Sequence, residues 1–193
     1  EIELAAPFLR GRIIGITGTN GKTTTTSLTG HILASAAVPV QVGGNIGTPV
    51  VAMAETSRDD QWNVIELSSF QLETARTFRA DVGVCLNVTQ NHLDRHRTME
   101  NYVAAKSNLF RMQREGSYAV LNSADPVCRT FAVLTPATKA WFSRAGVHDG
   151  KGCTGAGPHL ATEDTSVPGI AALRQARKAL DDVGKTGEIS LVY

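Results

Sequence analysis

The sequence predicts an α/β fold in which a mostly parallel sheet is flanked by helices. Two observations support this prediction. Short segments rich in apolar and β-branched residues alternate with segments that have apolar residues at helical spacing, and a glycine-rich stretch joins the first segment of each kind. This alternation favours parallel strands, because the connecting helices then cover both faces of the sheet. With 193 residues and 42% hydrophobic content, the chain is long enough for one well-buried core.

The expected strands are short apolar or β-branched segments bounded by turn residues. They comprise residues 13–16, 39–45, 62–67, 80–89 and 117–122. The first expected helix follows the glycine-rich stretch and has Leu28, Ile32 and Leu33 at helical spacing. Further helices are expected over residues 49–55, 70–78, 99–113 and 125–134. Asp125 and Pro126 begin the last of these, where a capping side chain and a proline are favoured.

Residues 143–193 have a different composition. Residues 144–159 are rich in glycine and are expected to form a loop. Residues 169–184 have the pattern of an amphipathic helix with a terminal glycine, and residues 188–193 have the pattern of a strand. We therefore expect one domain over residues 1–142, with residues 143–193 forming the end of the same domain.

Composition excludes several classes of protein. The net charge of +1 gives no electrostatic reason to expect binding to nucleic acid or to a membrane surface. No apolar stretch approaches the roughly eighteen residues that a membrane span requires, and the N-terminus lacks a secretion signal. Cys85, Cys128 and Cys153 are odd in number and widely spaced, which argues against a disulfide framework and a zinc site. We expect a soluble, cytoplasmic protein, and the absence of an initiating methionine suggests an excerpt from a longer chain.

A glycine-rich loop stands where the first strand turns into the first helix. Glycines there let backbone amides curl around phosphate oxygens, a lysine adds positive charge, and a hydroxyl can bind Mg²⁺. The strict P-loop pattern has a glycine where this chain has Ile16, so the match is to a shortened variant. The alternative is an ordinary capped turn, which would not explain Lys22. The expected nucleotide-binding residues are Gly18, Thr19, Asn20, Gly21, Lys22, Thr23 and Thr24, with Thr23 also on the metal.

One lysine interrupts an apolar helical stripe. At about 100° per residue, Lys106 falls among the apolar residues of the helix expected over 99–113, which are Met99, Tyr102, Val103, Leu109 and Phe110. Burying an unpaired ammonium group costs roughly several kcal/mol of free energy. Either Lys106 extends to the surface or pairs with a buried carboxylate, or it faces the nucleotide site as a cation or in chemically modified form.

Polar residues follow three of the expected strands. Glu66 ends the segment 62–67, where a carboxylate could bind Mg²⁺ or simply begin a loop or cap a helix. His92 lies with Asp94 and His96 after the segment 80–89, but the cluster lacks the further ligands of a zinc site, and His92 could equally be a surface residue. Asn45 could contact a substrate or serve as a turn residue beside glycines.

Four ordered motifs resemble the central ATPase domain of the Mur ligases. They are GTNGKTTTT, GGNIGTP, VIELSSFQLE, and NVTQNHLDRH followed by YVAAK, and they cover residues 1–142. The forms GGNIG and ELSSFQLE are most similar to the branch of the family that adds D-glutamate. This resemblance implies peptidoglycan precursor synthesis in the bacterial cytoplasm, by an ATP-dependent ligase that joins D-glutamate to UDP-N-acetylmuramoyl-L-alanine through an acyl phosphate.

The resemblance also implies roles for individual residues. Lys22 would bind phosphates, and Thr23 and Glu66 would hold a first Mg²⁺. His92 and a carbamylated Lys106 would support a second Mg²⁺, which would explain a lysine in an apolar stripe, because carbamylation turns a cation into an anion. Asn45 and Tyr102 match positions near the muramoyl substrate. Catalytic function is thus expected of Lys22, His92 and Lys106.

The chain also departs from the family pattern. It has no asparagine after Asn122, although the family places one near the adenine, and its N-terminus leaves no room for the domain that holds uridine. We therefore expect an isolated central domain that binds nucleotide weakly and needs its missing N- and C-terminal domains for ligation. Other interpretations are folylpolyglutamate synthase or a different Mur ligase, a P-loop nucleotide switch without ligase activity, and a degenerate domain kept for interaction.

Overall fold

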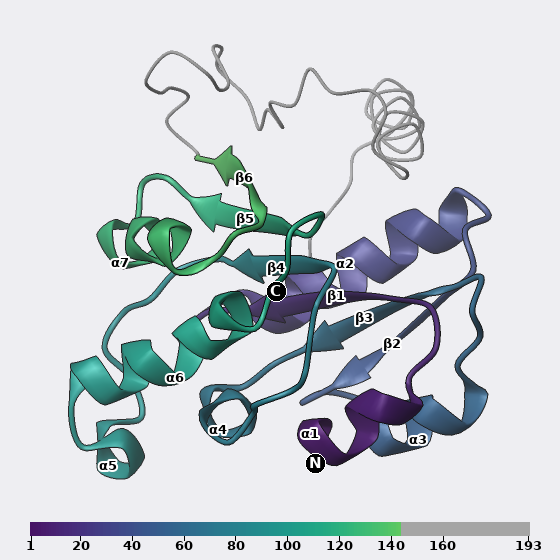
Figure 1. Cartoon of the computed structure of the whole chain (residues 1–193), viewed down its shortest axis with the longest axis horizontal. Helices are drawn as coiled ribbons and strands as arrows, with labels where there is room; N and C mark the ends of the chain where they lie inside the picture. The colour runs from purple at the N-terminus through teal and green to yellow at the C-terminus, as the bar shows by residue number, and fades with distance from the viewer. Residues whose placement is uncertain (144–193) are drawn as a thin grey trace, which may run out of the picture.

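Six parallel strands form one sheet at the centre of the molecule. The computed structural model describes residues 1–143. The strands are β1 (Arg12–Thr17), β2 (Val40–Gly44), β3 (Trp62–Glu66), β4 (Val82–Cys85), β5 (Tyr118–Asn122) and β6 (Thr138–Phe142). Their order in the sheet is β2-β3-β1-β4-β5-β6, and every neighbouring pair is parallel (Figure 1). The predicted α/β class is therefore confirmed.

Helices connect the strands. They are α1 (Ile2–Ala5), α2 (Lys22–Ser35), α3 (Val50–Thr56), α4 (Ser69–Glu73), α5 (Leu93–His96), α6 (Met99–Arg111) and α7 (Pro126–Thr130), with 3-10 turns η1 (Ala6–Phe8) and η2 (Phe131–Leu134). Within residues 1–143, no helix combines the length and the apolar character needed to cross a bilayer.

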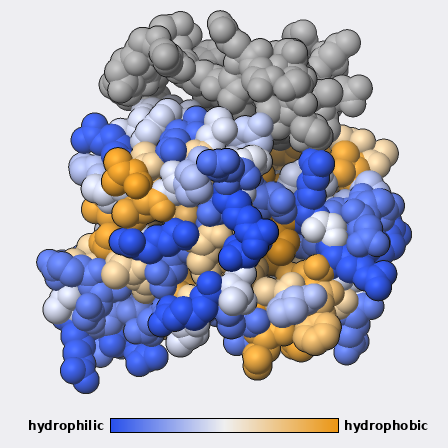
Figure 2. Space-filling view, viewed as in Figure 1, coloured by the Kyte–Doolittle hydropathy of each residue, from blue (hydrophilic) through white to orange (hydrophobic). Residues whose placement is uncertain are grey.

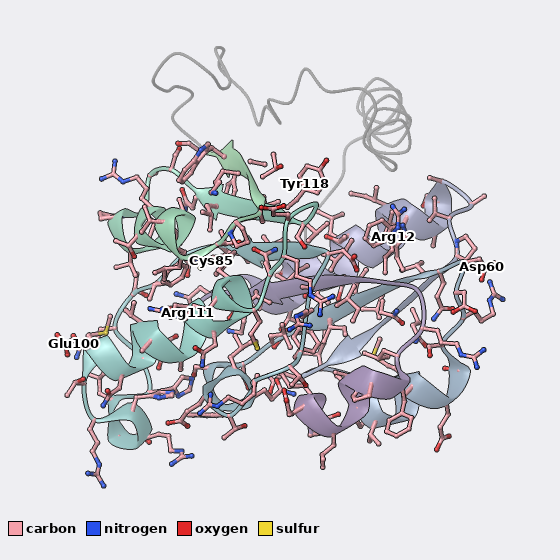
Figure 3. All side chains as sticks on the ribbon, in the orientation of Figure 1. Arg12, Asp60, Cys85, Glu100, Arg111 and Tyr118 are labelled. Atoms are coloured by element: carbon pink, nitrogen blue, oxygen red, sulfur yellow. The ribbon has the colours of Figure 1, made fainter. Side chains whose placement is uncertain are left out.

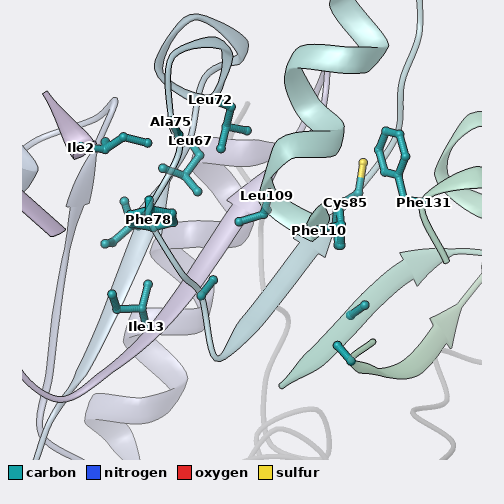
Figure 4. Packing of buried hydrophobic residues seen from close by; sticks show 14 of the residues in the cluster. Ile2, Ile13, Leu67, Leu72, Ala75, Phe78, Cys85, Leu109, Phe110 and Phe131 are labelled. Carbon is teal, nitrogen blue, oxygen red and sulfur yellow. The ribbon is translucent and has the colours of Figure 1, made fainter. Parts of the chain in front are cut away.

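The two faces of the sheet are buried by different partners. On one face, Leu33 of α2 packs with Ile16 and Val64. On the other face, a larger cluster joins residues of α1, α3, α4, α6, α7 and η2 to the sheet (Figure 4). Consecutive residues of β3 show the division, since Val64 belongs to the first cluster and Ile65 to the second. Burial on both faces explains why the strands are short apolar runs.

The five expected strands are present, with differences at their ends. Residues 86–89 were expected to continue β4, but the chain leaves the sheet after Cys85, and the Asn87 carbonyl accepts a hydrogen bond from the Thr19 amide 2.9 Å away. The strand β6 was not expected. It lies at the edge of the sheet, where Thr138 and Lys139 are exposed, so its apolar run is only the three residues 140–142.

The expected helices are also present, and two of them are shorter than expected. The segment 70–78 is helical only as α4, and residues 125–134 divide into α7 and η2. Asp125 caps α7 as expected, since its Oδ1 accepts hydrogen bonds from the Val127 and Cys128 amides. Leu28 was expected on the buried face of α2 but is 49% exposed, and the small residues Thr26 and Gly30 are buried against the sheet in its place. The expected loop, helix and strand over 144–159, 169–184 and 188–193 lie outside the described residues.

Two cysteines meet inside the core. Cys85 and Cys128 are free thiols, both fully buried, with their Sγ atoms 3.3 Å apart. Burial raises the pKa of the Cys128 thiol, as does its hydrogen bond to Cys85, which is the larger cause. Figure 4 shows Cys85 beside Phe131, among the side chains that join α6 and η2 to the sheet. The pair therefore acts as apolar core.

The N-terminal helix is tied to the segment that follows α4. The Glu3 carboxylate accepts hydrogen bonds from the amides of Arg76, Thr77 and Phe78 and from the Thr77 hydroxyl, which lies 2.7 Å away. These contacts explain why α4 ends early, because the chain turns to present three amides to one side chain. The Thr77 hydroxyl is the largest cause that lowers the pKa of Glu3, from 4.5 to about 2. Leu4, Phe8 and Val51 remain exposed near this junction. Figure 2 shows hydrophobic surface at its lower right, where α1 lies in Figure 1.

Glu3→Gln should destabilise the protein in a pH-dependent way. Because the folded pKa lies below the unfolded value, the carboxylate stabilises the fold above about pH 4.5 and loses this effect as pH falls toward about 2. The difference in unfolding free energy between wild type and variant should therefore be largest near pH 7 and shrink below pH 4.5. Urea unfolding from pH 3 to 7 measures it, with Glu55→Gln on the exposed end of α3 as control. A difference that does not change with pH would contradict this assignment.

Candidate functional site

The functional residues expected from the sequence gather at the carboxyl edge of the sheet. The ends of β1, β2, β3 and β4 are neighbours there, because the strands are parallel and adjacent in the order β2-β3-β1-β4. Figure 3 shows the two ends of the molecule. Arg12, which begins β1, lies on one side, and Glu100, in the first turn of α6, lies on the other. Segments far apart in the sequence therefore share one edge.

The phosphate loop runs from the end of β1 into α2. Gly21 is the N-cap of α2 with φ of 81°, and Gly18 has φ of 152°, so both lie in the backbone region that favours glycine. A Cβ on Gly18 would also lie 3.1 Å from the Leu86 side chain. Lys22 and Thr23 begin α2, while Thr24 is exposed in its first turn. The loop thus presents the amide end of a 14-residue helix at the sheet edge.

Asn87 fixes the conformation of this loop. Its side-chain Oδ1 accepts hydrogen bonds from the amides of Thr19 and Asn20, at 3.1 and 2.9 Å, and its Nδ2 donates to the Asn20 carbonyl. Thr19 adds a second link to the same segment, because its hydroxyl donates to the Thr89 carbonyl and accepts from the Thr89 amide. The sequence did not single out Asn87. Its position as the first residue of NVTQNH was the only available signal.

Glu66 ends β3 at the centre of the site. It is 2% exposed, and its two carboxylate oxygens accept from different segments. The Thr23 hydroxyl donates to Oε2 at 2.8 Å, and the Asn45 amide donates to Oε1 at 3.0 Å. A hydroxyl oxygen and a carboxylate are hard ligands of the kind that Mg²⁺ prefers, so Thr23 and Glu66 fit a magnesium site beside the phosphate loop. Asn45 lies in the same cluster.

Two lysines point at successive carbonyl groups of the loop. Lys22 Nζ donates to the Thr19 carbonyl at 2.9 Å. Lys106 Nζ donates to the Gly18 carbonyl at 2.8 Å and to the Thr17 hydroxyl at 3.4 Å. The position of Lys106 in the apolar helical stripe correctly predicted that its side chain is buried, since it is 2% exposed. Extension to the surface is excluded, and both of its hydrogen-bond partners within residues 1–143 are neutral oxygens.

Burial changes the acid–base behaviour of Lys106. Desolvation, with a smaller contribution from the nearby cation of Lys22, lowers its pKa from 10.5 to about 8. The face of the Tyr102 ring partly offsets the loss of water, because its centroid lies 4.7 Å from Nζ. Tyr102 is itself 1% exposed, and its hydroxyl lies 3.1 Å from the Thr19 hydroxyl. A substantial fraction of Lys106 is therefore neutral amine just above neutral pH.

His92 lies on the rim of the same site. It is exposed, it caps α5 with φ of 53°, and its ring packs 5.0 Å from Phe70 and 6.3 Å from Tyr102. An imidazole can bind a metal as a neutral ligand, whereas Lys106 as an ammonium group can only donate hydrogen bonds. Within residues 1–143, no three His, Cys, Asp or Glu side chains are grouped to hold a metal. A second metal would therefore need ligands supplied by a modified Lys106 and by substrate.

His92 and His96 of the NHLDRH segment differ in their burial. Asp94 is exposed, whereas His96 is buried and its Nε2 lies 2.9 Å from the Ser69 hydroxyl. The expected site residues thus lie at one edge of the sheet, where Glu66 contacts Thr23 and Asn45, and Tyr102 contacts Thr19 and Lys106. His92 and His96 differ in burial, although both rings contact Phe70 and Tyr102.

Comparison with known proteins agrees with these motifs. The model of the Mur ligase middle domain matches residues 16–166. A UDP-N-acetylmuramoylalanine--D-glutamate ligase of Solibacter usitatus is 71% identical over 143 residues, covering 74% of this chain and 32% of the relative. The enzyme of the same name from Acidobacterium capsulatum is 50% identical over 170 residues, covering 84% of this chain and 37% of the relative. The chain thus spans about a third of the length of these curated relatives.

Solved structures show the same fold at low sequence identity. The MurF ligase from Thermotoga maritima in complex with ADP superimposes with a TM-score of 0.62 at 18% identity, covering 100% of this chain and 51% of that one. A UDP-N-acetylmuramoyl-L-alanyl-D-glutamate--2,6-diaminopimelate ligase superimposes with a TM-score of 0.58 at 19% identity, covering 95% of this chain and 45% of that one. With the phosphate loop, the buried Glu66 and the family match over most of its length, the chain belongs to the Mur ligases and corresponds to their middle domain.

Proposed function

We propose that this chain is the ATP-binding middle domain of a ligase that joins D-glutamate to UDP-N-acetylmuramoyl-L-alanine. The relatives at 71% and 50% identity carry the name of that enzyme. The observation that carries the proposal is the buried Glu66 carboxylate, which is hydrogen-bonded both to the phosphate loop through Thr23 and to the GGNIG segment through Asn45. One side chain thereby couples the nucleotide site to a segment at the substrate side.

The reaction places two anions next to each other. The L-alanine carboxylate attacks the terminal phosphorus of ATP, ADP leaves, and an acyl phosphate forms. The amine of D-glutamate then attacks the acyl carbon, the tetrahedral adduct expels phosphate, and the amine proton goes to solvent. Bound Mg²⁺ supplies positive charge between the phosphates, and Thr23 and Glu66 would hold it. Lys22, whose Nζ bonds the Thr19 carbonyl, is close enough to exchange that partner for a phosphate oxygen.

The shape of the loop is set before nucleotide arrives, because Asn87 and Thr89 hold Thr19 and Asn20 from outside the loop. The Thr19 and Asn20 amides donate to Asn87, so the amides proposed to receive phosphate are those of the first turn of α2. Asn45 and Tyr102 are proposed to lie near the muramoyl substrate. Their contacts support this, because Asn45 donates to the Glu66 carboxylate and the Tyr102 hydroxyl lies beside the Thr19 hydroxyl. Domains outside this chain would complete the sites for uridine, adenine and D-glutamate.

Carbamylation of Lys106 belongs to this proposal. The neutral amine attacks carbon dioxide, a nitrogen–carbon bond forms, and one proton is released to leave a carbamate anion. A pKa of about 8 favours this reaction, because only the unprotonated amine is nucleophilic. The carbamate would replace a buried cation by an anion near His92 and so support a second Mg²⁺. Nucleotide substrates also favour a cytoplasmic location, as do two thiols that remain unlinked at 3.3 Å.

A chimera tests the substrate assignment. Residues 1–143 would replace the matching segment of the Solibacter usitatus ligase, and phosphate release would be measured with UDP-N-acetylmuramoyl-L-alanine and a panel of amino acids. We expect release that depends on D-glutamate, and a loss on the order of 10²-fold or more in Lys22→Ala and Glu66→Gln chimeras. Lys139→Ala, on the edge strand β6, should leave the rate unchanged. The 193-residue chain alone should show no D-glutamate-dependent release.

Two results would contradict the proposal. A chimera that binds ATP but requires a different amino acid would assign the domain to another Mur ligase. A chimera that binds ATP and ligates none, while the unmodified Solibacter enzyme is active, would support a nucleotide-binding domain without ligase function.

Carbamylation can be observed directly. In ¹³C-bicarbonate, the 193-residue chain should show a carbamate carbon signal whose occupancy rises with pH through about 8 at constant dissolved CO₂, because the amine then loses its proton. Lys106→Met should abolish the signal and Lys139→Met should retain it. A signal that is unchanged in Lys106→Met would reject Lys106 as the modified residue.

Lys106→Met should also stabilise the unmodified domain. A folded pKa of about 8 against 10.5 means that the protonated lysine destabilises the fold below pH 8, by about 3 kcal/mol at 1.36 kcal/mol per pKa unit. In CO₂-free buffer at pH 7, urea unfolding should show the variant to be more stable than wild type. The difference should vanish between pH 8 and 10.5, where the unfolded lysine binds more protons than the folded one. A less stable variant at pH 7 would show that the hydrogen bonds to Gly18 and Thr17 outweigh desolvation.

A further inference from the structure

A buried histidine holds the turn that carries His92. The side chain of His96 is fully buried, and its Nε2 lies 2.9 Å from the Ser69 hydroxyl at the start of α4. Its ring stacks on Phe70, with centroids 5.3 Å apart and planes inclined by 17°, and lies 5.4 Å from the Tyr102 ring of α6. His96 therefore links α4, α5 and α6.

The same aromatic side chains also contact His92. Phe70 lies between the two imidazoles, 5.0 Å from His92 and 5.3 Å from His96, and Tyr102 lies within 6.3 Å of both. The backbone adds another link, because the His96 amide donates to the His92 carbonyl at 2.9 Å. Any rotation of the His96 ring would therefore disturb the surface on which the His92 ring rests.

The turn between them is held in an uncommon backbone conformation. His92 at its start has φ of 53° and Arg97 at its end has φ of 69°. Non-glycine residues adopt positive φ at a cost, so side-chain contacts must maintain the turn. On this turn, exposed Arg95 pairs with Glu73 and lies over the Phe70 ring, 6.0 Å from its centroid, and contacts of an exposed side chain are weak restraints. The buried contacts of His96 are the stronger one.

A histidine at position 96 can fix its ring by a hydrogen bond, which an apolar side chain that only fills the space cannot do. An apolar ring would fill the space between Phe70 and Tyr102 without the cost of burying a polar group. The hydrogen bond to Ser69 fixes the rotation of the imidazole, and either ring tautomer can make it, because a hydroxyl both donates and accepts. Nδ1 has no hydrogen-bond partner within residues 1–143, and the nearest carboxylate oxygen, on Glu73, is 3.9 Å away. Burial lowers the pKa of His96, which keeps the ring neutral.

We propose that His96, held by Ser69, is a positioning residue that orients His92 through the shared Phe70 and Tyr102 rings and the turn 92–97. This inference rests on the proposed function of His92 as a metal ligand. His96 touches neither nucleotide nor metal in this scheme. It fixes the place of the one imidazole that does.

The first test needs no metal. In the 193-residue chain, nuclear Overhauser effects between the His92 and Phe70 rings report their packing. We expect Ser69→Ala and His96→Phe to weaken these signals, while His96→Gln, whose amide can reach the position of Nε2, should restore them in part. Asp94→Asn, on the same turn and exposed, should have no effect. Ser69→Ala removes only a hydroxyl, so it decides the question if His96→Phe does not fold.

The second test measures the metal. Manganese binding is titrated by electron paramagnetic resonance, with a non-hydrolysable ATP analogue and bicarbonate present. His92→Ala should abolish binding of a second Mn²⁺, and Ser69→Ala and His96→Phe should weaken it on the order of tenfold, as outer-shell partners of metal ligands do. The first Mn²⁺, on Thr23 and Glu66, should keep its affinity. In the His92→Ala background, His96→Phe should cause no further loss.

The outcomes separate the two proposals. If His92→Ala removes the second metal but Ser69→Ala and His96→Phe leave it and the ring contacts intact, the positioning role is wrong and the ligase assignment stands. If His92→Ala has no effect on metal binding, or wild type binds only one Mn²⁺, the role of His92 is wrong and the positioning role fails with it. Equal weakening of both metals would show a general loss of structure instead of positioning.

Discussion

The burial of Lys106 beneath the phosphate loop is the constraint on which the site depends. The Lys106 side chain is 2% exposed, so its ammonium group needs hydrogen-bond acceptors within the protein. It donates to the Gly18 carbonyl and to the Thr17 hydroxyl. This contact fixes the distance between α6 and the end of β1. It also holds the Gly18 carbonyl toward the buried Lys106 side chain. The same burial lowers the pKa of the lysine and so prepares an amine for modification.

The order of the strands brings the other site residues together. The segments GTNGKT, GGN, ELSS and NVTQNH follow β1, β2, β3 and β4, and these four strands are neighbours in the sheet. A parallel sheet brings the carboxyl ends of adjacent strands to one edge, so short loops suffice to place Thr23, Asn45 and Glu66 within hydrogen-bond distance. The helix α6 crosses beneath this edge and adds Lys106 and Tyr102. The sheet topology thus places the site residues close enough for their side chains to contact one another.

The sequence predicted what local patterns encode. The β-branched runs predicted the strands, the glycines and Lys22 predicted the phosphate loop, and helical spacing predicted that Lys106 is buried. It did not predict contacts between distant segments, because nothing local marks them. Asn87 pins the loop only because β4 lies beside β1, and α4 ends early only because Glu3 accepts three amides from residues 76–78. The sequence also did not predict the edge strand β6, because its exposed residues need not be apolar.

The arrangement also explains why a stable core and a reactive site can share α6. The C-terminal part of the helix buries Leu109 and Phe110 in the main cluster, while Lys106, one turn earlier, and Tyr102, two turns earlier, lie in the site. A packed helix cannot shift by fractions of an ångström without disturbing both ends. The rigidity that Leu109 and Phe110 give to α6 is therefore transmitted to Lys106 and, through Tyr102, to the rim at His92 and His96. Positioning in this site is a property of the hydrophobic core as much as of the polar residues that would touch the ligand.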